Sequence, residues 1–500
     1  MARLADEVEV LGVRKEWRKD ALIALGLLAL ALVFFWPVVF GGKTLVPTDN
    51  LVQWPPWQAY AEQLGVGVPH NALLSDLLLE NYPWKRFIVE SISARQIPFW
   101  NPYLFAGVPF LAAGQHSALY PFSVLFYVLP ITWAYGLFAV LHFFLAGLFM
   151  YAYLRVVRLG RWGALLGGLT YAFSGFMITS VVFPMIGAAA TWLPLLLAIT
   201  ELIFQKEEHR AKSIEHSGFL GSSLFLILGG GIVLGIQFLA GHVEIAVYNL
   251  LVLAFYSLWR LVTISWRQRA WRPLLRLVAQ LAALVALGFA LGAVQLIPLY
   301  ELVRTSFRQG SVSYGDVIGW AYQPRQLLAF VLPDVFGNPA HHTYLDVLDG
   351  TVQAVTSNFA GQPIDTIFWG VKNYVEGTAY AGILPLLLAL LAILGYLAER
   401  WATRRGRVGR LSLAATPEGR YGRLCRKMTS RRESTPLGGS GIPNLFGRLP
   451  LSSQKAPQQV EDSPPLVIFR QSHGKPPYTP CSSLLFLFDK PQWHRPPEIR

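Results

Sequence analysis

Long apolar segments recur along most of the chain, separated by shorter polar ones. The apolar runs are near-continuous stretches of Leu, Ala, Val, Ile and Phe at 21–40, 133–154, 162–180, 186–204, 219–240, 243–262, 275–298 and 379–397. About 20 residues of helix are enough to cross the hydrocarbon core of a bilayer. The pattern therefore predicts an all-α polytopic membrane protein with about eight transmembrane helices.

The positive residues between these runs indicate the direction in which each helix crosses. Clusters of Lys and Arg precede the first run and follow the second, fourth, sixth and eighth, so all clusters share one side if every run spans. Because cytoplasmic loops are enriched in Lys and Arg, residues 1–20 are predicted to be cytoplasmic. Two long segments, about 41–132 and 299–378, are then outer loops of a transmembrane domain at 21–400.

The composition supports a membrane protein. The 500 residues are 53% hydrophobic and only 14% charged, whereas a soluble domain has about 25% charged residues. The formal net charge of +13 fits loops held beside anionic lipid and gives no support for nucleic-acid binding. The first run is long and no small-residue cleavage site follows it, so it is interpreted as a signal anchor.

The segment 401–500 differs from the rest of the chain. It is rich in Pro, Arg and Ser, contains no run that would span a membrane, and holds both cysteines, Cys425 and Cys481. Two interpretations stay open, a disordered cytoplasmic tail and translation in the wrong reading frame. The membrane part contains no Cys, which excludes disulfides and thiolate metal sites there.

Acidic residues recur at one spacing in the first outer loop. In "TDNLVQWPPW" and "SDLLLENYPW", Asp49 and Asp76 each stand seven residues before a Pro and eight before a Trp. A carboxylate beside a bilayer can serve as a general base or a metal ligand. Each also has a structural interpretation, since Asp49 fits a turn and Asp76 fits the first turn of a helix.

A short amphipathic helix is predicted directly after the second acidic motif. One face carries Trp84, Phe87, Ile88, Ser91 and Ile92, and the other carries Lys85, Arg86, Val89 and Glu90. Such a helix is expected to lie along the membrane surface.

The stretch "IPFWNPYLFAGVPFLA", 97–112, is too rich in Pro and Gly for a helix and too apolar for a water-facing loop. Aromatic rings prefer the interface between water and lipid, so Trp84, Trp100, Tyr103 and Phe105 are predicted to contact that interface. Plain packing of a loop is the alternative interpretation.

Polar residues at the outer ends of the helices are the remaining candidates for a site. They are expected to line one cavity facing the first outer loop, although capping and snorkelling would also account for them. The set comprises His242, Glu244, Gln295, Glu301, Arg304 and Arg308, and His116, directly after the stretch 97–112 in the first outer loop, is a further candidate. No HExxH, CxxC, P-loop or GxSxG motif is present, so soluble nucleotide or hydrolase chemistry has no support.

Several of these stretches resemble the YfhO-type family of bacterial membrane proteins. The similarity lies in "DLLLENYPW", "IPFWNPYLFAGVPFLAAGQHSALYP", "GALLGGLTYAFSGFM", "QFLAGHVEIAVYN" and "GAVQLIPLYELVRTSFR", which occur in the family's order. It covers roughly residues 20–400. Family members are usually longer and usually read "GHPQ" where this chain has Gly241, His242, Val243 and Glu244.

The resemblance implies a fold and an activity. The family is placed with the GT-C glycosyltransferases, multi-helix enzymes of the bacterial plasma membrane that take a sugar from a polyprenyl-phosphate carrier on the outer face. It is linked to glycosylation of cell-envelope polymers such as teichoic acid. By this resemblance, Asp76 is the base or metal-binding residue, and Asp49 matches a position where many GT-C enzymes keep another acid.

The expected reaction is glycosyl transfer to an envelope polymer or lipid. Asp76 or Asp49 would accept the proton of the acceptor, and Arg86, Arg304, Arg308 or His242 would bind the phosphate. A divalent cation is possible, with the two aspartates as ligands. The alternatives are a transporter or flippase of lipid-linked sugars, and a non-catalytic partner in envelope assembly.

Overall fold

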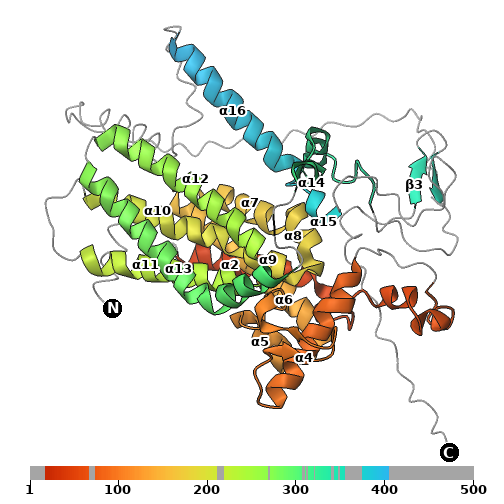
Figure 1. Cartoon of the computed structure of the whole chain (residues 1–500). Helices are drawn as coiled ribbons and strands as arrows, with labels where there is room; N and C mark the ends of the chain where they lie inside the picture. The colour runs from red at the N-terminus through yellow and green to blue at the C-terminus, as the bar shows by residue number, and fades with distance from the viewer. Residues whose placement is uncertain are drawn as a thin grey trace, which may run out of the picture. The chain divides into compact units, whose positions relative to one another are not determined.

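The computed structural model describes residues 17–66, 74–210, 219–268, 271–306, 310, 313–319, 321–338, 343–346, 350–354 and 374–404. Contacts divide it into two units, the first reaching Leu386 and the second beginning at Leu387. Nearly every described element belongs to the first unit. The helices and strands are labelled in Figure 1. The segment 401–500, for which two interpretations were left open, lies outside the described residues from 405 onward.

Each predicted span corresponds to a helix or to two consecutive helices. In chain order they are α2 (Trp17–Phe34) with α3 (Trp36–Val39), α6 (Ile131–Val156), α7 (Arg161–Ala172) with α8 (Gly175–Thr179), α9 (Pro184–Thr191) with α10 (Leu193–Arg210), α11 (Phe219–Leu239), α12 (Val243–Gln268), α13 (Trp271–Thr305) and α16 (Ile383–Arg404). Among the described residues, 6 helical stretches are long and apolar enough to cross a membrane. The all-α polytopic fold is therefore confirmed.

Three of the predicted spans are divided into two helices, and two of these breaks coincide with a capping residue or a proline. Ser174 caps α8 by accepting a hydrogen bond from the Met177 N–H at 3.3 Å, so the backbone restarts after α7. The second interruption separates α9 from α10 at Trp192, two residues before Pro194. Proline has no N–H to donate to the preceding turn, so a break at this point is expected.

Small residues bring α11 and α13 close together. A Cβ atom added at Gly231 would lie 2.6 Å from the Leu287 side chain, and one added at Gly235 would lie 2.7 Å from Leu291. Glycines four residues apart therefore form the flat face that the small-residue spacing predicts. In the same unit, α6 packs against α2, α7 and α10, and α10 packs against α11 and α12.

Charged side chains gather at one end of the helices of the first unit. Arg161, at the start of α7, pairs with Asp20 of α2 at 3.0 Å, and Tyr151 of α6 also donates a hydrogen bond to Asp20. Arg260 of α12 pairs with Glu201 of α10 at 2.8 Å. These contacts join helix ends that the charge pattern assigns to the cytoplasmic side. This agrees with the predicted topology, in which the start of one helix and the end of its antiparallel neighbour lie on the same side.

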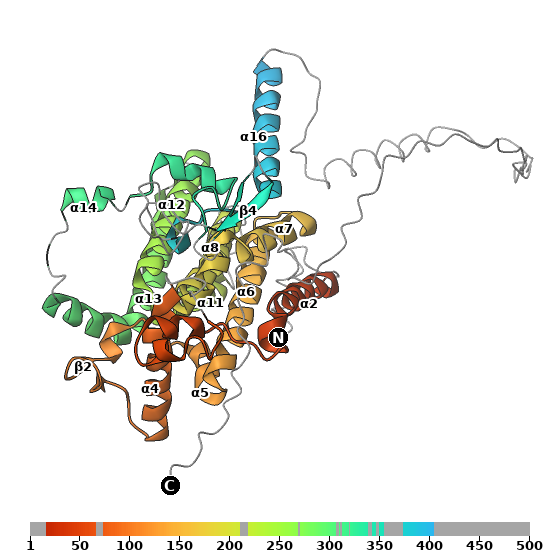
Figure 2. The same ribbon diagram turned by 90° about the vertical axis from the view of Figure 1, so that its right-hand side faces the viewer.

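The first outer segment packs at the opposite end of these helices. Its elements are η1 (Thr48–Gln53), η2 (Trp57–Tyr60), η4 (Leu77–Asn81), α4 (Tyr82–Ser93), β1 (Trp100–Asn101), β2 (Val108–Pro109), η5 (Leu111–Ala113), η6 (Pro121–Ser123) and α5 (Val124–Val128). The antiparallel strands β1 and β2 pair Trp100 with Pro109 and form a hairpin within the stretch predicted to be irregular (Figure 2).

The second outer segment contributes shorter elements. They are α14 (Tyr314–Gly319), η8 (Pro324–Phe330), the antiparallel pair β3 (Thr343–Asp346) and β4 (Thr351–Ala354), and α15 (Tyr374–Gly377). The Gly175 N–H donates to the Tyr380 carbonyl at 2.7 Å, which fixes the end of this segment beside the break between α7 and α8.

The amphipathic helix forms as predicted, but one prediction about its faces is wrong. Lys85, expected on the polar face, is 1% exposed, whereas Ile92, expected on the apolar face, is 45% exposed. The Lys85 Nζ donates to the His116 carbonyl at 2.6 Å and lies 4.5 Å from the centre of the Phe126 ring. These two partners stabilise an ammonium group that the helical spacing alone assigns to solvent.

Candidate functional site

A cavity of about 230 Å³ lies at the outer end of the first unit. One wall comes from the segment around η4 and the start of α4, and the opposite wall comes from the connection between η7 (Ser180–Val182) and α9. The lining residues used below are Asp76, Glu80, Asn81, Trp84, Gln115, Phe183, Met185, Ile186 and His242. Asp76 and His242, which were predicted to belong to one site, therefore line one cavity, together with Trp84, which was predicted to contact the interface.

Two carboxyl groups, those of Asp76 and Glu80, line the cavity and are four residues apart in the chain. Asp76 immediately precedes η4, and Glu80 follows four residues later, which places the two acids on one side of a helical turn. The pKa of Glu80 is raised, first because burial disfavours its charged form and then because the Asp76 carboxylate lies nearby. Sequence reasoning missed Glu80, although the spacing of four residues was a visible signal.

An amide donor lies next to this pair of acids. Asn81 is 4% exposed, and its Oδ1 accepts a hydrogen bond from the Tyr135 hydroxyl at 2.8 Å. Its Nδ2 has no hydrogen-bond partner among the described residues. A buried donor without a partner costs free energy, and here it belongs to a residue that lines the cavity. Asn81 was also missed, because nothing in the sequence distinguishes it from other amides.

His242 lies between the cavity and the start of α12. Its Nδ1 accepts a hydrogen bond from the Ile245 N–H at 3.3 Å, so the ring caps the helix. Glu244, two residues further along, is exposed in the first turn of α12 and does not line the cavity. The helix N-terminus favours a negative side chain at this position.

Two other predicted residues hold the loop that carries Gln115. Gln295 is 2% exposed, and its Nε2 donates to the Leu111 carbonyl at 2.9 Å. His116 is 1% exposed; its Nδ1 accepts from the Ala118 N–H at 2.9 Å, and its Nε2 lies 2.9 Å from the Phe110 carbonyl. Both ring nitrogens are thus engaged by the backbone, which favours a structural role for this histidine.

The pKa of His116 is consistent with that role. Burial, followed by the neighbouring Lys85 ammonium, lowers its pKa to about 4. A histidine with this pKa is neutral at physiological pH, so it gives little attraction for a phosphate. The hydrogen bonds of its ring hold the turn that ends the aromatic hairpin.

The remaining predicted residues lie outside the lining of the cavity. Asp49 is 3% exposed and belongs to η1, which packs against η4. Arg86 is exposed and pairs with Glu90 at 2.8 Å. Glu301 and Arg304 are exposed near the end of α13. Arg308 lies outside the described residues.

The aromatic residues predicted for the interface fall into two groups. Trp84 lines the cavity. Trp100, Tyr103 and Phe105 belong to the hairpin segment and are 54%, 78% and 94% exposed. The chain therefore presents rings around the hairpin turn that no other described part of the protein covers.

The acids also bear on the predicted divalent cation. Asp76 and Glu80 offer carboxylate oxygens, which are the ligands that Mg²⁺ and Ca²⁺ prefer. Within the described ranges, no three His, Cys, Asp or Glu residues gather in a group that holds a metal by itself. A cation bound here would therefore need oxygen ligands from water or substrate to complete its shell.

Comparisons with known proteins identify the type of membrane protein. No match was found among curated proteins, and none was found among solved structures. The family model described as "Bacterial membrane protein YfhO" matches residues 114–210, which include Gln115, the connection before α9, and α10. The chain is a multi-pass membrane protein whose residues 114–210 are similar to the bacterial membrane protein YfhO family.

Proposed function

We propose that this protein is a membrane glycosyltransferase that moves a sugar from a polyprenyl-phosphate carrier to a cell-envelope polymer or lipid. The observation that carries the proposal is the cavity in which Asp76 and Glu80 face His242 and the connection before α9. It combines carboxylates, amide donors and aromatic carbon. These are the groups that bind hydroxyl-rich ligands and activate a hydroxyl nucleophile.

Asp76 acts as the general base in this mechanism. An acceptor hydroxyl attacks the anomeric carbon of the donor, Asp76 takes the hydroxyl proton, and the bond from the anomeric carbon to the phosphate oxygen breaks. The polyprenyl phosphate leaves with the bonding electrons and needs no acid. Glu80 lines the same cavity and can accept a hydrogen bond from a sugar hydroxyl. Asp49 is the alternative base.

Amide and imidazole groups orient the donor. Asn81 Nδ2, which has no partner among the described residues, donates to a sugar hydroxyl or to a phosphate oxygen. Gln115 and His242 line the same cavity and complete the polar contacts. A hydrogen bond to a charged oxygen is worth roughly 1.5–3 kcal/mol, so these donors favour a phosphorylated donor over a free sugar.

The carrier approaches from the bilayer along apolar surface. Trp84, Phe183, Met185 and Ile186 line the cavity beside its polar groups and would contact the first isoprene units. The exposed rings of Trp100, Tyr103 and Phe105 would hold the hairpin at the interface. If a divalent cation is bound, Asp76 and Glu80 would hold it, and it would neutralise charge on the phosphate.

The test is a transfer assay in membranes that contain the full chain. Labelled polyprenyl-phosphate sugars are supplied, and label in envelope polymer and lipid is measured. Asp76→Asn is expected to lower transfer about 10²–10⁴-fold, which is what a positioned base contributes. Glu90→Gln is the matched control, because Glu90 is an exposed carboxylate on α4 that pairs with Arg86 outside the cavity.

The same assay separates the alternatives. If Asp49→Asn abolishes transfer and Asp76→Asn does not, the base is Asp49. Transfer that survives both substitutions contradicts the catalytic proposal. If vesicles that contain the parent chain show no sugar transfer but move a labelled lipid-linked sugar from one leaflet of the membrane to the other, the protein is a transporter. Absence of both activities favours a non-catalytic partner in envelope assembly.

A further inference from the structure

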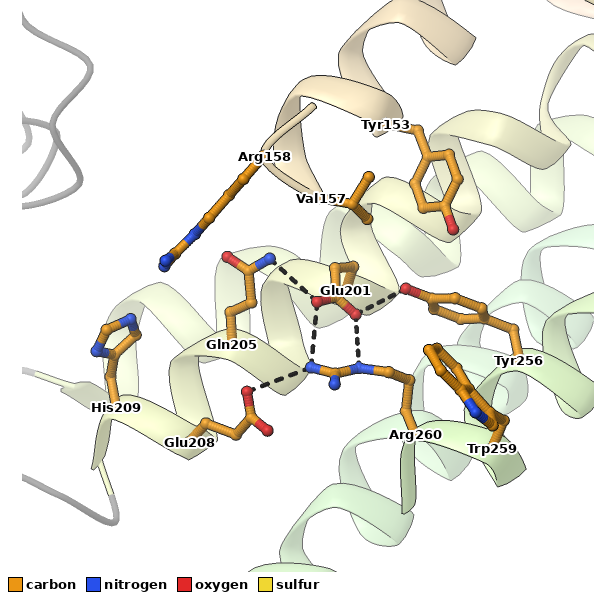
Figure 3. A pocket seen from close by; sticks show the side chains of 10 residues that line it. All are labelled: Tyr153, Val157, Arg158, Glu201, Gln205, Glu208, His209, Tyr256, Trp259 and Arg260. Carbon is orange, nitrogen blue, oxygen red and sulfur yellow. Dashed lines mark hydrogen bonds and ion pairs between the residues drawn. The ribbon is translucent and has the colours of Figure 1, made fainter. Parts of the chain in front are cut away.

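A larger cavity, of about 540 Å³, lies at the opposite end of the first unit from Asp76 (Figure 3). It is formed where α6 ends and where α10 and α12 approach their last turns. It shares no lining residue with the cavity described above. According to the charge pattern of the loops, this end faces the cytoplasm.

The ion pair between Glu201 and Arg260 forms one wall of this cavity, and each carboxylate oxygen of Glu201 accepts two hydrogen bonds. Glu201 Oε2 accepts from Arg260 Nε and from the Tyr256 hydroxyl, both at 2.8 Å. Its Oε1 accepts from Arg260 Nη2 at 3.1 Å and from Gln205 Nε2 at 3.0 Å. The arrangement ties α10 to α12 and leaves the charge of Glu201 compensated.

Two basic side chains, Arg158 and His209, line the opening of this cavity on the side away from the ion pair. Arg158 follows α6 in a left-handed conformation with φ of +68°, and it is exposed. In Figure 3 its guanidinium lies on the same side of the cavity as the ring of His209, next to Gln205. In the described part of the chain, neither Arg158 nor His209 has an ion-pair or hydrogen-bond partner through its side chain. This side of the mouth is therefore suited to an anion.

A carboxylate lies on the other side of the mouth. Glu208 Oε2 lies 3.3 Å from Arg260 Nη2, and the Glu208 side chain is 23% exposed. Arg260 is already paired in bidentate fashion with Glu201, so it compensates Glu208 only in part. The opening of the cavity is therefore lined by the Arg158 guanidinium on one side and by the Glu208 carboxylate on the other.

Apolar surface continues outward from the cavity along α12. Trp259 lines the cavity and is 53% exposed. On the same helix, Leu251, Phe255 and Leu258 are 62%, 75% and 61% exposed. Side chains of this kind on a membrane-spanning helix contact acyl chains. A ligand with a polar head in the cavity can therefore lay an apolar tail along this helix.

We infer that this cavity binds the head group of a zwitterionic phospholipid that carries a primary ammonium, of the phosphoethanolamine class. Arg158 and His209 take the phosphate, Glu208 takes the ammonium, and Trp259 packs on the glycerol and upper acyl chains. The charges of the cavity support this choice. Two arginines face two glutamates, so a ligand with balanced and separated charges fits better than an anion.

The test measures lipid retained by the full chain, purified in detergent, by native mass spectrometry. Ethanolamine, choline and glycerol phospholipids with identical acyl chains are compared. The ethanolamine lipid is expected to bind best, since only its head group places a primary ammonium beside Glu208. Arg158→Gln is expected to weaken its binding about tenfold, the effect of one charge-assisted hydrogen bond. Glu208→Gln is expected to remove the preference over the glycerol lipid.

Two controls decide the result. Arg272→Gln removes an exposed arginine that does not line the cavity, and it is expected to leave binding unchanged. Equal binding by the parent and Arg158→Gln overturns the site, and equal binding of the ethanolamine and glycerol lipids overturns the head-group assignment. Displacement of the lipid by an equal concentration of water-soluble glycerophosphoethanolamine would show that the ligand is the head group alone, and would contradict a membrane-lipid site.

Discussion

Lys85 shows how a single buried charge is accommodated beneath the candidate active site. Its neighbours along α4, Trp84 and Arg86, line the cavity and face solvent respectively, whereas Lys85 points into the packed loop. Burial lowers its pKa to about 7. The Lys85 Nζ contacts the His116 carbonyl and the Phe126 ring. A titrating lysine therefore links the helix of the acidic motif to the loop that carries Gln115.

The pKa of Lys85 predicts how stability depends on pH. The folded value, about 7, lies below the ordinary value of 10.5, so the unfolded chain binds more protons between these two pH values. The contribution of Lys85 to the free energy of unfolding therefore rises with pH across that window, by at most about 1.4 kcal/mol per pH unit. Lys85→Met is expected to remove this rise.

The measurement is thermal unfolding of the parent and of Lys85→Met in detergent at pH 7 and pH 9.5. The stability difference between the two proteins should shift in favour of the parent at the higher pH. Ile88→Met is the control, because it perturbs a buried position on the same helix and keeps the lysine. A pH slope identical in the parent and in Lys85→Met would show that Lys85 does not titrate in this range.

The site residues differ in how far the sequence alone reveals them. Asp76 was identified from its repeated spacing to a Pro-Trp pair, and His242 from its place at a helix end. Glu80 and Asn81 were missed because their importance depends on which face of η4 lines the cavity. For His116 and Gln295 the sequence predicted a place in a cavity, and only the three-dimensional contacts show that both are buried with backbone atoms as partners.

Among the elements, docking of the first outer loop depends on very close contacts with the connection between α11 and α12. The Ser117 hydroxyl donates to the Ala240 carbonyl at 2.7 Å. Gly241 adopts φ of +97°, and a Cβ atom added there would lie 2.5 Å from the Gly114 carbonyl oxygen. A glycine is therefore needed at position 241 both for its conformation and for the approach of the loop.

Gly241→Ala is expected to destabilise the docked loop by about 1–3 kcal/mol, the cost of holding a side chain in this backbone region. The variant should unfold at a lower temperature and be cleaved faster by protease within the first outer segment. Gly229→Ala is the matched control on α11, since a Cβ atom there meets nothing within 4 Å. Unchanged unfolding and cleavage of Gly241→Ala would show that this contact does not hold the loop.

Periodicity predicts the long elements better than the short ones. Apolar runs predicted the long helices of the membrane domain, because about 20 apolar residues admit few other structures. The hairpin of β1 and β2 was not predicted, because two-residue strands leave no alternating pattern. The breaks between α7 and α8 and between α9 and α10 were also not predicted. These breaks arise from the Ser174 cap and from Pro194. The hydropathy summed over a whole apolar run does not depend on such single residues, so it does not predict the breaks.

For the molecule as a whole, the two ends of the helices carry different chemistry. The end with Asp20, Glu201 and Arg260 is held by ion pairs. At the opposite end, the outer loop is held by single hydrogen bonds to backbone carbonyls, such as those from Trp133 to Val39 and from Gln295 to Leu111. Lys and Arg are therefore concentrated at the end predicted to be cytoplasmic, while the acids of the candidate site lie at the other.

This asymmetry predicts which positions a membrane-impermeant maleimide reaches in intact cells. After replacement of Cys425 and Cys481 by Ser, a Cys introduced at exposed Tyr103 in the outer hairpin should be labelled without permeabilisation. A Cys introduced at exposed Arg272, in the first turn of α13, should be labelled only after permeabilisation, because an even number of predicted spans separates it from the N-terminus. Labelling of both positions in intact cells would contradict the topology. The reverse pattern would place the Asp76 cavity in the cytoplasm, where a lipid-linked donor of the outer face cannot reach it.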